Sequence, residues 1–233
     1  MLHELRKYRL ERSPRPLSGF REYAFDLFYG VDTRVLFQIA ARSSGDATLT
    51  RTYFYQPTAV GLVGEILKQL PIVYEDYTLI DMGSGKGRFL LLASHLPFTK
   101  IIGIEVSPTL HETACRNIWR YRSSRQRCFE VESRCVDASL FRVPDDKAIF
   151  YFYNPFDEHV MATVLSHIRD SLLRRSRQIY IIYSYPIHHH VMDESGFLVR
   201  LKEGGGAFPQ CYFIYANSVQ NLDVHNRSPV LIP

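Results

Sequence analysis

An apolar run, one acid and three alternating glycines follow one another between Tyr77 and Arg88. As a strand, a tight turn and a helix, this stretch places backbone N–H groups and a helix N-terminus at the carboxyl end of a strand, where α/β sheets bind ligands. Glycine suits such a turn because a side chain would hold the backbone away from the ligand, and because some turn positions require positive φ. The stretch therefore predicts an α/β fold with a nucleotide-like binding loop.

The glycine spacing excludes two common nucleotide-binding loops. The dinucleotide pattern G-x-G-x-x-G requires glycine where Arg88 stands. A phosphate-binding loop requires glycine at Ile80 and serine or threonine at Gly87. The remaining pattern, an acid followed by G-x-G-x-G, resembles the first motif of class I methyltransferases that depend on S-adenosylmethionine (SAM).

Length and composition indicate one soluble domain. The chain has 233 residues, of which 46% are hydrophobic, enough for one substantial core. Its longest apolar runs have strand length, so we expect no membrane span, and its charged N-terminus lacks the apolar region of a secretory signal. We expect a cytoplasmic protein whose four cysteines are reduced thiols. The formal charge of +4 neither indicates nor excludes a nucleic-acid partner.

Alternating strand-like and helical runs from residue 57 onward predict a doubly wound, Rossmann-like sheet. We expect a helical N-terminal cap over residues 1–56, with helical spacing of apolar residues over 20–41, and a methyltransferase-like domain over 57–233. Within that domain a helix is predicted from Pro57 to Pro71. Strands are expected at 77–82, 100–105, within 127–132, within 148–153 and within 178–185, and helices at 86–95, 108–121 and within 157–173. Residues 197–202 and 211–216, joined across three glycines, predict a closing antiparallel hairpin, similar to the end of a seven-stranded methyltransferase sheet.

The methyltransferase resemblance extends over residues 53–157 and implies a cofactor site. It implies that Asp81 faces the ammonium group of SAM and that the loop residues Gly83, Ser84, Gly85 and Gly87 embrace its methionine part. Glu105, at the end of an apolar strand, matches the acid that accepts both ribose hydroxyls. A carboxylate suits that role because it only accepts hydrogen bonds.

Asp137 and Ala138 match the position that reads the adenine ring, the carboxylate through the exocyclic amine and the backbone near Ala138 through the ring edge. A plain surface aspartate is the alternative for Asp137. After the next strand, Asn154, Pro155 and Phe156 resemble the Asn/Asp-Pro-Pro-Tyr/Phe motif of methyltransferases that act on nitrogen, with one proline missing. The resemblance implies that Asn154 accepts hydrogens from the target amine beside the cofactor while Phe156 packs against it. An ordinary strand-ending turn is the alternative.

Upstream of the glycine loop, Tyr55 to Thr58 resemble the Tyr-x-Pro-Ser/Thr segment of some protein lysine methyltransferases, including those related to the Dot1 type, in which it covers the cofactor. A helix start with proline at its first position is the alternative and is compatible with that role. The segment from Phe25 to Thr33 resembles one that precedes the core of uncharacterised bacterial class I methyltransferases.

Together these motifs predict a SAM-dependent methyltransferase that acts on nitrogen in a protein side chain or a small amine, forms S-adenosylhomocysteine, and needs no metal. The first alternative is methylation of RNA or DNA bases, and the second is a SAM-binding sensor or scaffold without catalysis. Nucleic acid is the less favoured partner, because few aromatics alternate with the arginines at 116, 120, 122, 125 and 127, and because cations suit a helix end. The run His188 to His190 predicts a polar loop, since adjacent residues do not converge on one metal ion.

Overall fold

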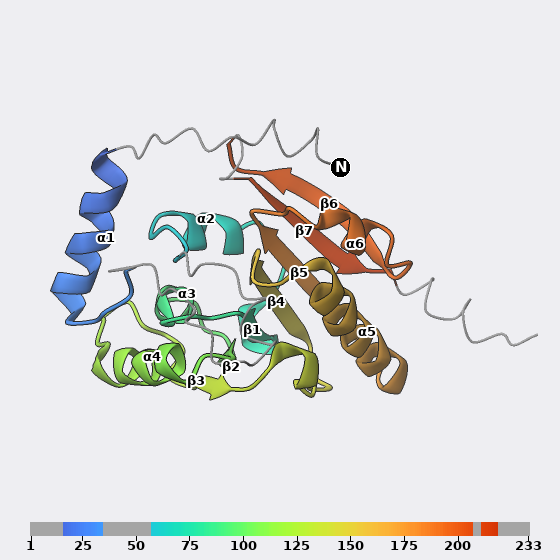
Figure 1. The fold of residues 1–233 in the computed structure, drawn as a ribbon, viewed down its shortest axis with the longest axis horizontal. Coiled ribbons are helices and arrows are strands. Elements are labelled where there is room, and N and C mark those ends of the chain that lie inside the picture. Colours follow the sequence, from blue (N-terminus) through green and yellow to red (C-terminus); the bar gives the residue numbers. More distant parts are fainter. Residues whose placement is uncertain (1–15, 35–56, 207–210, 219–233) are drawn as a thin grey trace, which may run out of the picture.

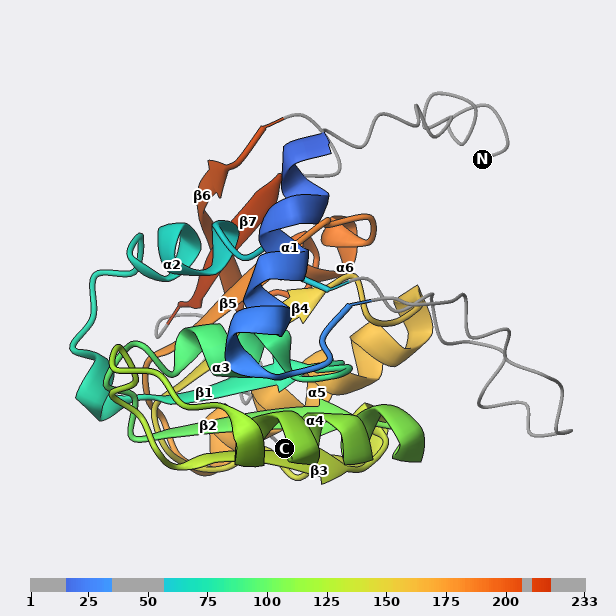
Figure 2. The same cartoon turned by 90° about the vertical axis from the view of Figure 1, so that its left-hand side faces the viewer.

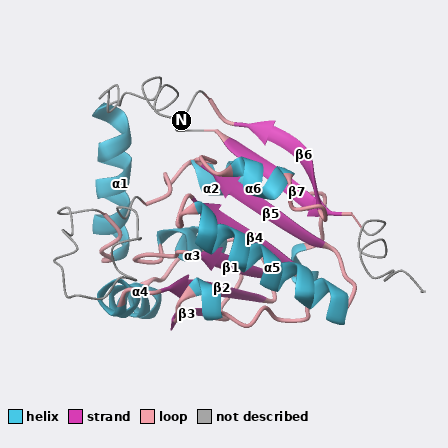
Figure 3. Cartoon of the chain, turned by 45° about the vertical axis from the view of Figure 1, so that its right-hand side comes forward, coloured by secondary structure: helices cyan, strands magenta, loops and turns pink. Residues whose placement is uncertain are grey.

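The computed structural model describes residues 16–34, 57–206 and 211–218, which form a sheet with helices on both faces (Figures 1 and 3). The sheet has seven strands in the order β3-β2-β1-β4-β5-β7-β6. Its parallel strands are β1 (Thr78–Met82), β2 (Lys100–Glu105), β3 (Val131–Cys135), β4 (Ala148–Tyr153) and β5 (Ile179–Ser184). The antiparallel strands β6 (Leu198–Gly204) and β7 (Tyr212–Asn217) confirm the predicted closing hairpin.

The strand order reverses between β1 and β4, and this position matters for the site. From β1 the chain moves outward through β2 to β3 and then returns to β4 on the other side of β1. In open α/β sheets ligands bind outside the carboxyl ends of the strands at such a reversal. The ends of β1 and β4 therefore frame the expected ligand crevice.

Two apolar layers hold the helices against the sheet. On one face α5 (Glu158–Arg174) and α6 (His189–Asp193) pack on strand residues such as Ile80, Phe150 and Ile181. On the other face α2 (Leu62–Leu67) and α3 (Arg88–Ala93) pack on Leu79 and Ile149. α4 (Pro108–Arg120) lies on this second face beside the edge strand β3. Single-turn helices cover Tyr74–Asp76 and Ala138–Leu140. The predicted doubly wound architecture is confirmed.

The helix α1 (Pro16–Tyr29) lies outside the second face and packs on α3 and α4 through a small apolar cluster that contains Phe25, Leu91 and Tyr121 (Figure 2). The prediction of a helix over 20–41 is wrong for residues 30–34, because Gly30 takes a φ of +65° and Val31 N–H donates to the Asp26 carbonyl at the end of the helix. Residues 35–41 lie outside the described part. The division of the chain into a cap and a domain at residue 56 stays a prediction.

Two further boundaries differ from the prediction. The helix expected from Pro57 begins at Leu62, because the preceding residues bond to other elements: the Thr58 hydroxyl bonds with the buried Tyr151 hydroxyl, and Val60 N–H donates to Glu22. The third strand begins at Val131 and runs to Cys135, beyond the expected 127–132. Residues Arg127 and Cys128 instead donate their N–H groups to the Ser94 carbonyl. As an edge strand, β3 is at most half-buried and carries polar residues, so it gives no apolar pattern.

All four cysteines are free, as predicted. In the described residues no helix is long and apolar enough to cross a membrane.

Candidate functional site

The glycine loop between β1 and α3 is held against the end of β2. The N–H groups of Gly83 and Ser84 both donate to the Ile104 carbonyl, at 2.9 Å each. Gly83, Gly85 and Gly87 have φ values of +95°, +54° and +83°, which side chains of L-residues rarely permit. The three glycines are therefore required by the backbone of this turn, as the motif predicts.

Glu105, at the end of β2, is 7% exposed and contacts the glycine loop directly. Its Oε2 accepts from Gly85 N at 2.8 Å, and its Oε1 accepts from Ser107 N at 2.8 Å. Burial raises the pKa of Glu105, while the N–H groups of Ser107, Gly85 and Val106 oppose that rise. A carboxylate offers about four acceptor positions, so Glu105 ties the loop to β2 and keeps capacity to accept from a ligand.

Asp81, in the middle of the β1 motif, is 3% exposed. Burial, with a smaller contribution from the nearby charge of Glu105, raises the pKa of Asp81 well above its usual value. No side chain or N–H group in the described residues donates a hydrogen bond to its carboxylate. A buried carboxylate without a hydrogen-bond donor destabilises the fold. Such a group is typical of a binding site in which a cationic ligand pairs with it.

A cavity of about 20 Å³ opens beside Asp81. Its lining includes Thr58, Asp81, Gly83, Ser84, Arg88 and Tyr153. The Ser84 hydroxyl is buried without a hydrogen-bond partner, so the lining holds polar groups that a ligand would satisfy. The volume suits about one water molecule and is far below that of a nucleoside pocket. Cofactor binding therefore requires the side chains around the cavity to move.

The predicted adenine-reading residues lie further along the same edge of the sheet. Asp137 N-caps the turn Ala138–Leu140, with Oδ1 accepting from Ser139 N at 2.8 Å and from Ser139 Oγ at 2.7 Å. Ala138 is buried in the apolar layer beneath α5. The preceding Val136 N–H donates to the Glu105 carbonyl, which places this turn next to the end of β2. The structure therefore brings Asp137 and Glu105 to neighbouring strand ends and gives Asp137 a capping role.

Asn154 and Pro155 follow β4 and meet the glycine loop across the reversal point. A Cβ built on Gly83 would lie 2.5 Å from Pro155 Cβ, so only glycine permits this approach. Phe156 packs edge-on against Phe152 and joins the apolar layer under α5, at 6.2 Å between ring centroids. The predicted cofactor and catalytic segments are thus in contact through Gly83 and Pro155, while the partly buried Phe156 ring packs against the core.

The Asn154 side chain is oriented by a residue that the sequence analysis did not identify. Tyr183, in β5, donates its hydroxyl to Asn154 Oδ1 at 3.1 Å and accepts from His188 N at 3.1 Å. Both Asn154 and Tyr183 are buried. Because Tyr183 is the penultimate residue of the wholly buried strand β5, the sequence pattern alone could have indicated only a core tyrosine.

Backbone strain marks the same edge. Asn154 and Tyr185 have φ values of +42° and +53°, the positive values among the described residues other than glycine. They follow the neighbouring strands β4 and β5, and the rings of Tyr153 and Tyr185 lie 6.2 Å apart. Such conformations cost roughly 1 to 3 kcal/mol each and cluster at functional sites. The strain marks the ends of β4 and β5 as part of the candidate site.

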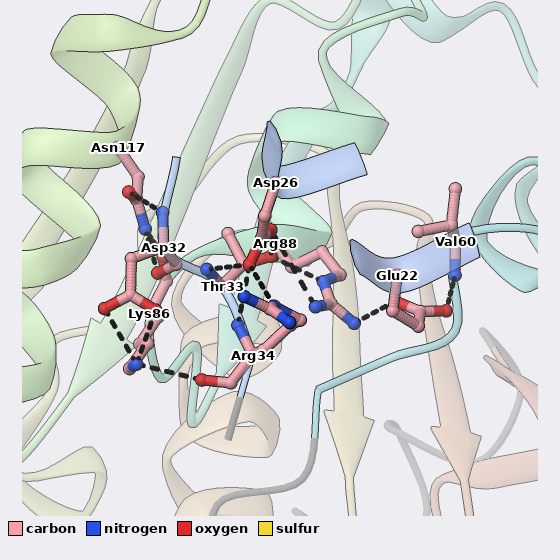
Figure 4. Close-up of polar contacts among 9 residues, drawn as sticks. All are labelled: Glu22, Asp26, Asp32, Thr33, Arg34, Val60, Lys86, Arg88 and Asn117. Carbon is pink, nitrogen blue, oxygen red and sulfur yellow. Dashed lines mark hydrogen bonds and ion pairs between the residues drawn. The ribbon is translucent and has the colours of Figure 1, made fainter. Parts of the chain in front are cut away.

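A buried polar network supports the glycine loop from α1, and Arg88 is its centre (Figure 4). Arg88 is 2% exposed, pairs with Glu22, donates from Nε to Thr33 Oγ1 at 2.7 Å, and lies 4.0 Å from Asp26. Asp26 in turn accepts from Thr33 N and pairs with Arg34. The sequence analysis treated Arg88 only as a departure from the dinucleotide pattern. The signal it missed is the pair of acids four residues apart on α1.

Lys86 and Asn117 extend this network to both ends of the loop (Figure 4). Lys86 pairs with Asp32 at 2.8 Å and donates to the Arg34 carbonyl. The Asn117 amide, on α4, donates to the carbonyls of Lys86 and Asp32 and accepts from Asp32 N. Since Lys86 and Arg88 flank Gly87, residues 22–34 hold the loop and the start of α3 in place from outside the sheet.

Other predicted features lie apart from this edge or outside the described residues. Tyr55, expected to cover the cofactor, lies outside them, while Thr58 donates to or accepts from the Tyr151 hydroxyl at 2.9 Å. The prediction that His188 to His190 form a loop is wrong, because α6 begins at His189. The His189 ring pairs with Asp193, four residues further along this helix. A larger cavity of about 140 Å³, between α5 and α6, includes none of the predicted site residues.

No family model matches the chain, and no curated protein matches it. Solved structures match its fold. The glycopeptide N-methyltransferase MtfA, complexed with SAM, matches with a TM-score of 0.52 and 10% identity, over 70% of this chain and 95% of MtfA. A SAM-dependent methyltransferase from Leishmania major matches with a TM-score of 0.51 and 14% identity, over 68% of this chain and 71% of that one. The pyocyanin biosynthetic protein PhzM matches at 0.51 and 12%, over 67% of this chain and 54% of PhzM, about half its length. The chain therefore shares the class I methyltransferase fold.

Proposed function

We propose that the protein is a SAM-dependent methyltransferase that acts on a nitrogen atom. The observation that carries the proposal is the junction at the reversal point, where the glycine loop with buried Asp81 and Glu105 touches the Asn154-Pro155 turn. The fold shared with SAM-dependent methyltransferases supports it. The Dot1-type resemblance and the division of the chain at residue 56 stay predictions.

The residues at the junction suit SAM by charge and by shape. Asp81 is a buried acid that a ligand ammonium would pair with, and Ser84 Oγ is a buried hydroxyl that needs a partner. Gly83 and Gly85 expose backbone near these groups, and Glu105 keeps acceptor capacity for hydroxyls. When bound, SAM would supply a methyl group on a positively charged sulfur. In the proposed site Asp137 and Ala138 would face the adenine, and Thr58 would help to cover the cofactor, while the same role for Tyr55 stays a prediction.

The chain's own contribution to the transfer is alignment and exclusion of water. Asn154 Oδ1, held by Tyr183, would accept a hydrogen bond from the acceptor amine and fix its lone pair in line. Asn154 carries no titratable group, and burial raises the pKa of Tyr153 to about 12, so neither removes a proton near neutral pH. The acceptor must then arrive uncharged, and turnover should rise with pH until the amine is deprotonated.

Calorimetric titration with SAM and with S-adenosylhomocysteine tests the cofactor. Binding of either supports the proposal, and a well-folded protein that binds neither rejects it. Transfer of labelled methyl groups to a library of peptides and small amines then tests the chemistry. Cofactor binding without transfer to any acceptor would favour the sensor or scaffold alternative, and transfer to bases of RNA or DNA would favour the nucleic-acid alternative.

A further inference from the structure

A dense group of exposed arginines and aromatics lies at the end of the sheet opposite the candidate site. We define the arginine surface as the side chains Arg116, Trp119, Arg120, Arg122, Arg125, Arg127 and Phe129. Trp119 is 74% exposed and Phe129 is 76% exposed, and the five arginines are also exposed. A single exposed aromatic is ordinary, but exposed aromatics that accompany a group of charged side chains are typical of an interaction surface.

The topology determines where this surface lies. α4 begins just after Glu105, where the carboxyl ends of the parallel strands lie, and it ends before the start of β3. Its last turn therefore lies near the amino ends of the strands (Figure 2). Phe129 lies two residues before β3 and therefore near the same end of the sheet. Trp119 and Phe129 therefore flank the loop that carries Arg122 and Arg125. The length of β3, roughly 17 Å, separates this surface from the candidate site.

The arginines are not neutralised by neighbouring acids. Between Glu112 and Glu130 the chain contains five arginines and no acid or lysine. Within the described residues none of the five forms an ion pair. Arg116 donates to Thr113 Oγ1, and Arg122 donates to the adjacent Tyr121 carbonyl. The nearby charge of Arg125 adds to burial in lowering the pKa of His95. The surface is thus strongly electropositive.

A favourable interaction with the helix end does not account for this arrangement. Cations in the last turn of a helix interact with its dipole, which explains Arg116 and Arg120 at most. Arg122, Arg125 and Arg127 lie in the loop beyond α4. The second arginine group, at the end of α5, behaves differently: Arg174 pairs with Asp145, and Arg177 donates to the carbonyls of Pro144, Asp146, Ser171 and Arg175. Arg174 and Arg177 are therefore tied to other segments of the fold, whereas in the described residues no arginine of the arginine surface pairs with an acid.

We propose that the arginine surface binds single-stranded nucleic acid. Planar guanidinium groups match phosphate oxygens in a two-pronged geometry, and exposed aromatic rings provide stacking platforms for unpaired bases. An acidic protein face would satisfy the arginines and would leave the two rings without a specific partner. The inference does not depend on the proposed methyl transfer, because the surface and the candidate site lie at opposite ends of the strands.

The protein provides its own reporter, because Trp119 is the only tryptophan in the chain. Titration with labelled oligoribonucleotides and oligodeoxyribonucleotides is followed by fluorescence anisotropy and by Trp119 emission. We expect binding that weakens with salt, together with a change in Trp119 emission as a base stacks on it. Comparison of the two affinities shows whether the surface prefers RNA or DNA.

Two sets of variants locate the binding. Arg120→Gln/Arg122→Gln/Arg125→Gln should lower the slope of log affinity against log salt by about 2, since each phosphate contact on a single strand contributes about 0.7. Trp119→Ala should weaken binding roughly tenfold. The matched control, Arg169→Gln/Arg175→Gln near the end of α5, should bind as the unmodified protein does. Thermal melting checks that each variant is folded, and single arginine substitutions replace the triple variant if it is not.

Three results would overturn the inference. The first is absence of oligonucleotide binding at low salt, and the second is equal loss of affinity in the triple variant and in the α5 control. The third is tighter binding of polyglutamate than of an oligonucleotide of equal charge with no change in Trp119 emission, which would assign the surface to an acidic protein. A parallel SAM titration keeps this test separate, since its failure would reject the methyltransferase proposal and leave the surface unaffected.

Discussion

Replacement of Gly83 by alanine tests the contact that joins the two halves of the candidate site. Gly83 has a φ of +95°, and its added Cβ would lie 2.5 Å from Pro155 Cβ. The positive φ costs about 1 to 2 kcal/mol for a residue with a side chain, and overpacking costs about 1 to 3 kcal/mol. We therefore expect Gly83→Ala to lower the free energy of unfolding by about 2 to 5 kcal/mol.

Gly196→Ala is the matched control, because Gly196 has a φ of +75° and open space where its Cβ would lie. It should cost only the backbone component, about 1 to 2 kcal/mol. Urea unfolding of both variants, and of Gly83→Ala combined with Pro155→Gly, gives the free energies and the coupling between the two positions. If Gly83→Ala is no more destabilising than Gly196→Ala, or if the double variant shows no coupling, the close contact between the glycine loop and the Asn154-Pro155 turn is refuted.

Four further outcomes follow from the same contacts. Glu105→Ala should weaken SAM binding at least tenfold, because each hydrogen bond to a charged group contributes about 1.5 to 3 kcal/mol. Asn154→Ala should abolish turnover and leave the SAM affinity measured by calorimetry nearly unchanged. Equal losses of SAM affinity in the two variants would overturn these roles. Tyr183→Phe, which removes the hydroxyl on Asn154 Oδ1, should lower the turnover number and not the SAM affinity. Arg88→Met should destabilise the fold by about 3 kcal/mol, since it leaves Glu22 and Asp26 without their buried cation; unchanged urea unfolding would contradict the network. Burial raises the pKa of Asp81, so its charged form opposes folding. The stability of the unmodified protein should therefore fall relative to that of Asp81→Asn as pH rises above about 4. A pH series of unfolding curves in which the two proteins do not diverge would disprove this effect of burial.

Local patterns predicted most elements because the buried strands have continuous apolar runs. β1, β2, β4 and β5 are almost wholly buried, and their predicted ranges agree with the structure to within a residue or two. The errors lie where neighbours outside the local pattern decide the backbone. β3 is a polar edge strand, and α1 ends at Gly30 although apolar spacing continues past it.

The residues of the candidate site also differ in whether the sequence could predict them. Glycines with positive φ and acids at strand ends belong to local motifs, so Gly83, Gly85, Asp81 and Glu105 could be found from the glycine spacing together with the methyltransferase resemblance. Tyr183 and Arg88 could not, because their partners are distant in the chain: Asn154 precedes Tyr183 by 29 residues, and Glu22 precedes Arg88 by 66.

The sequence by itself determined the glycine loop, the order of the strands along the chain and the positions of the acids, because turn chemistry and hydrophobic periodicity act over a few residues. Only the tertiary structure decided that Pro155 closes on Gly83, that α1 supports the loop through Arg88, and that Trp119 stays open to water beside arginines that pair with no acid in the described residues. These contacts arise when the sheet reverses its order and brings distant segments together, and no short window of sequence contains that information.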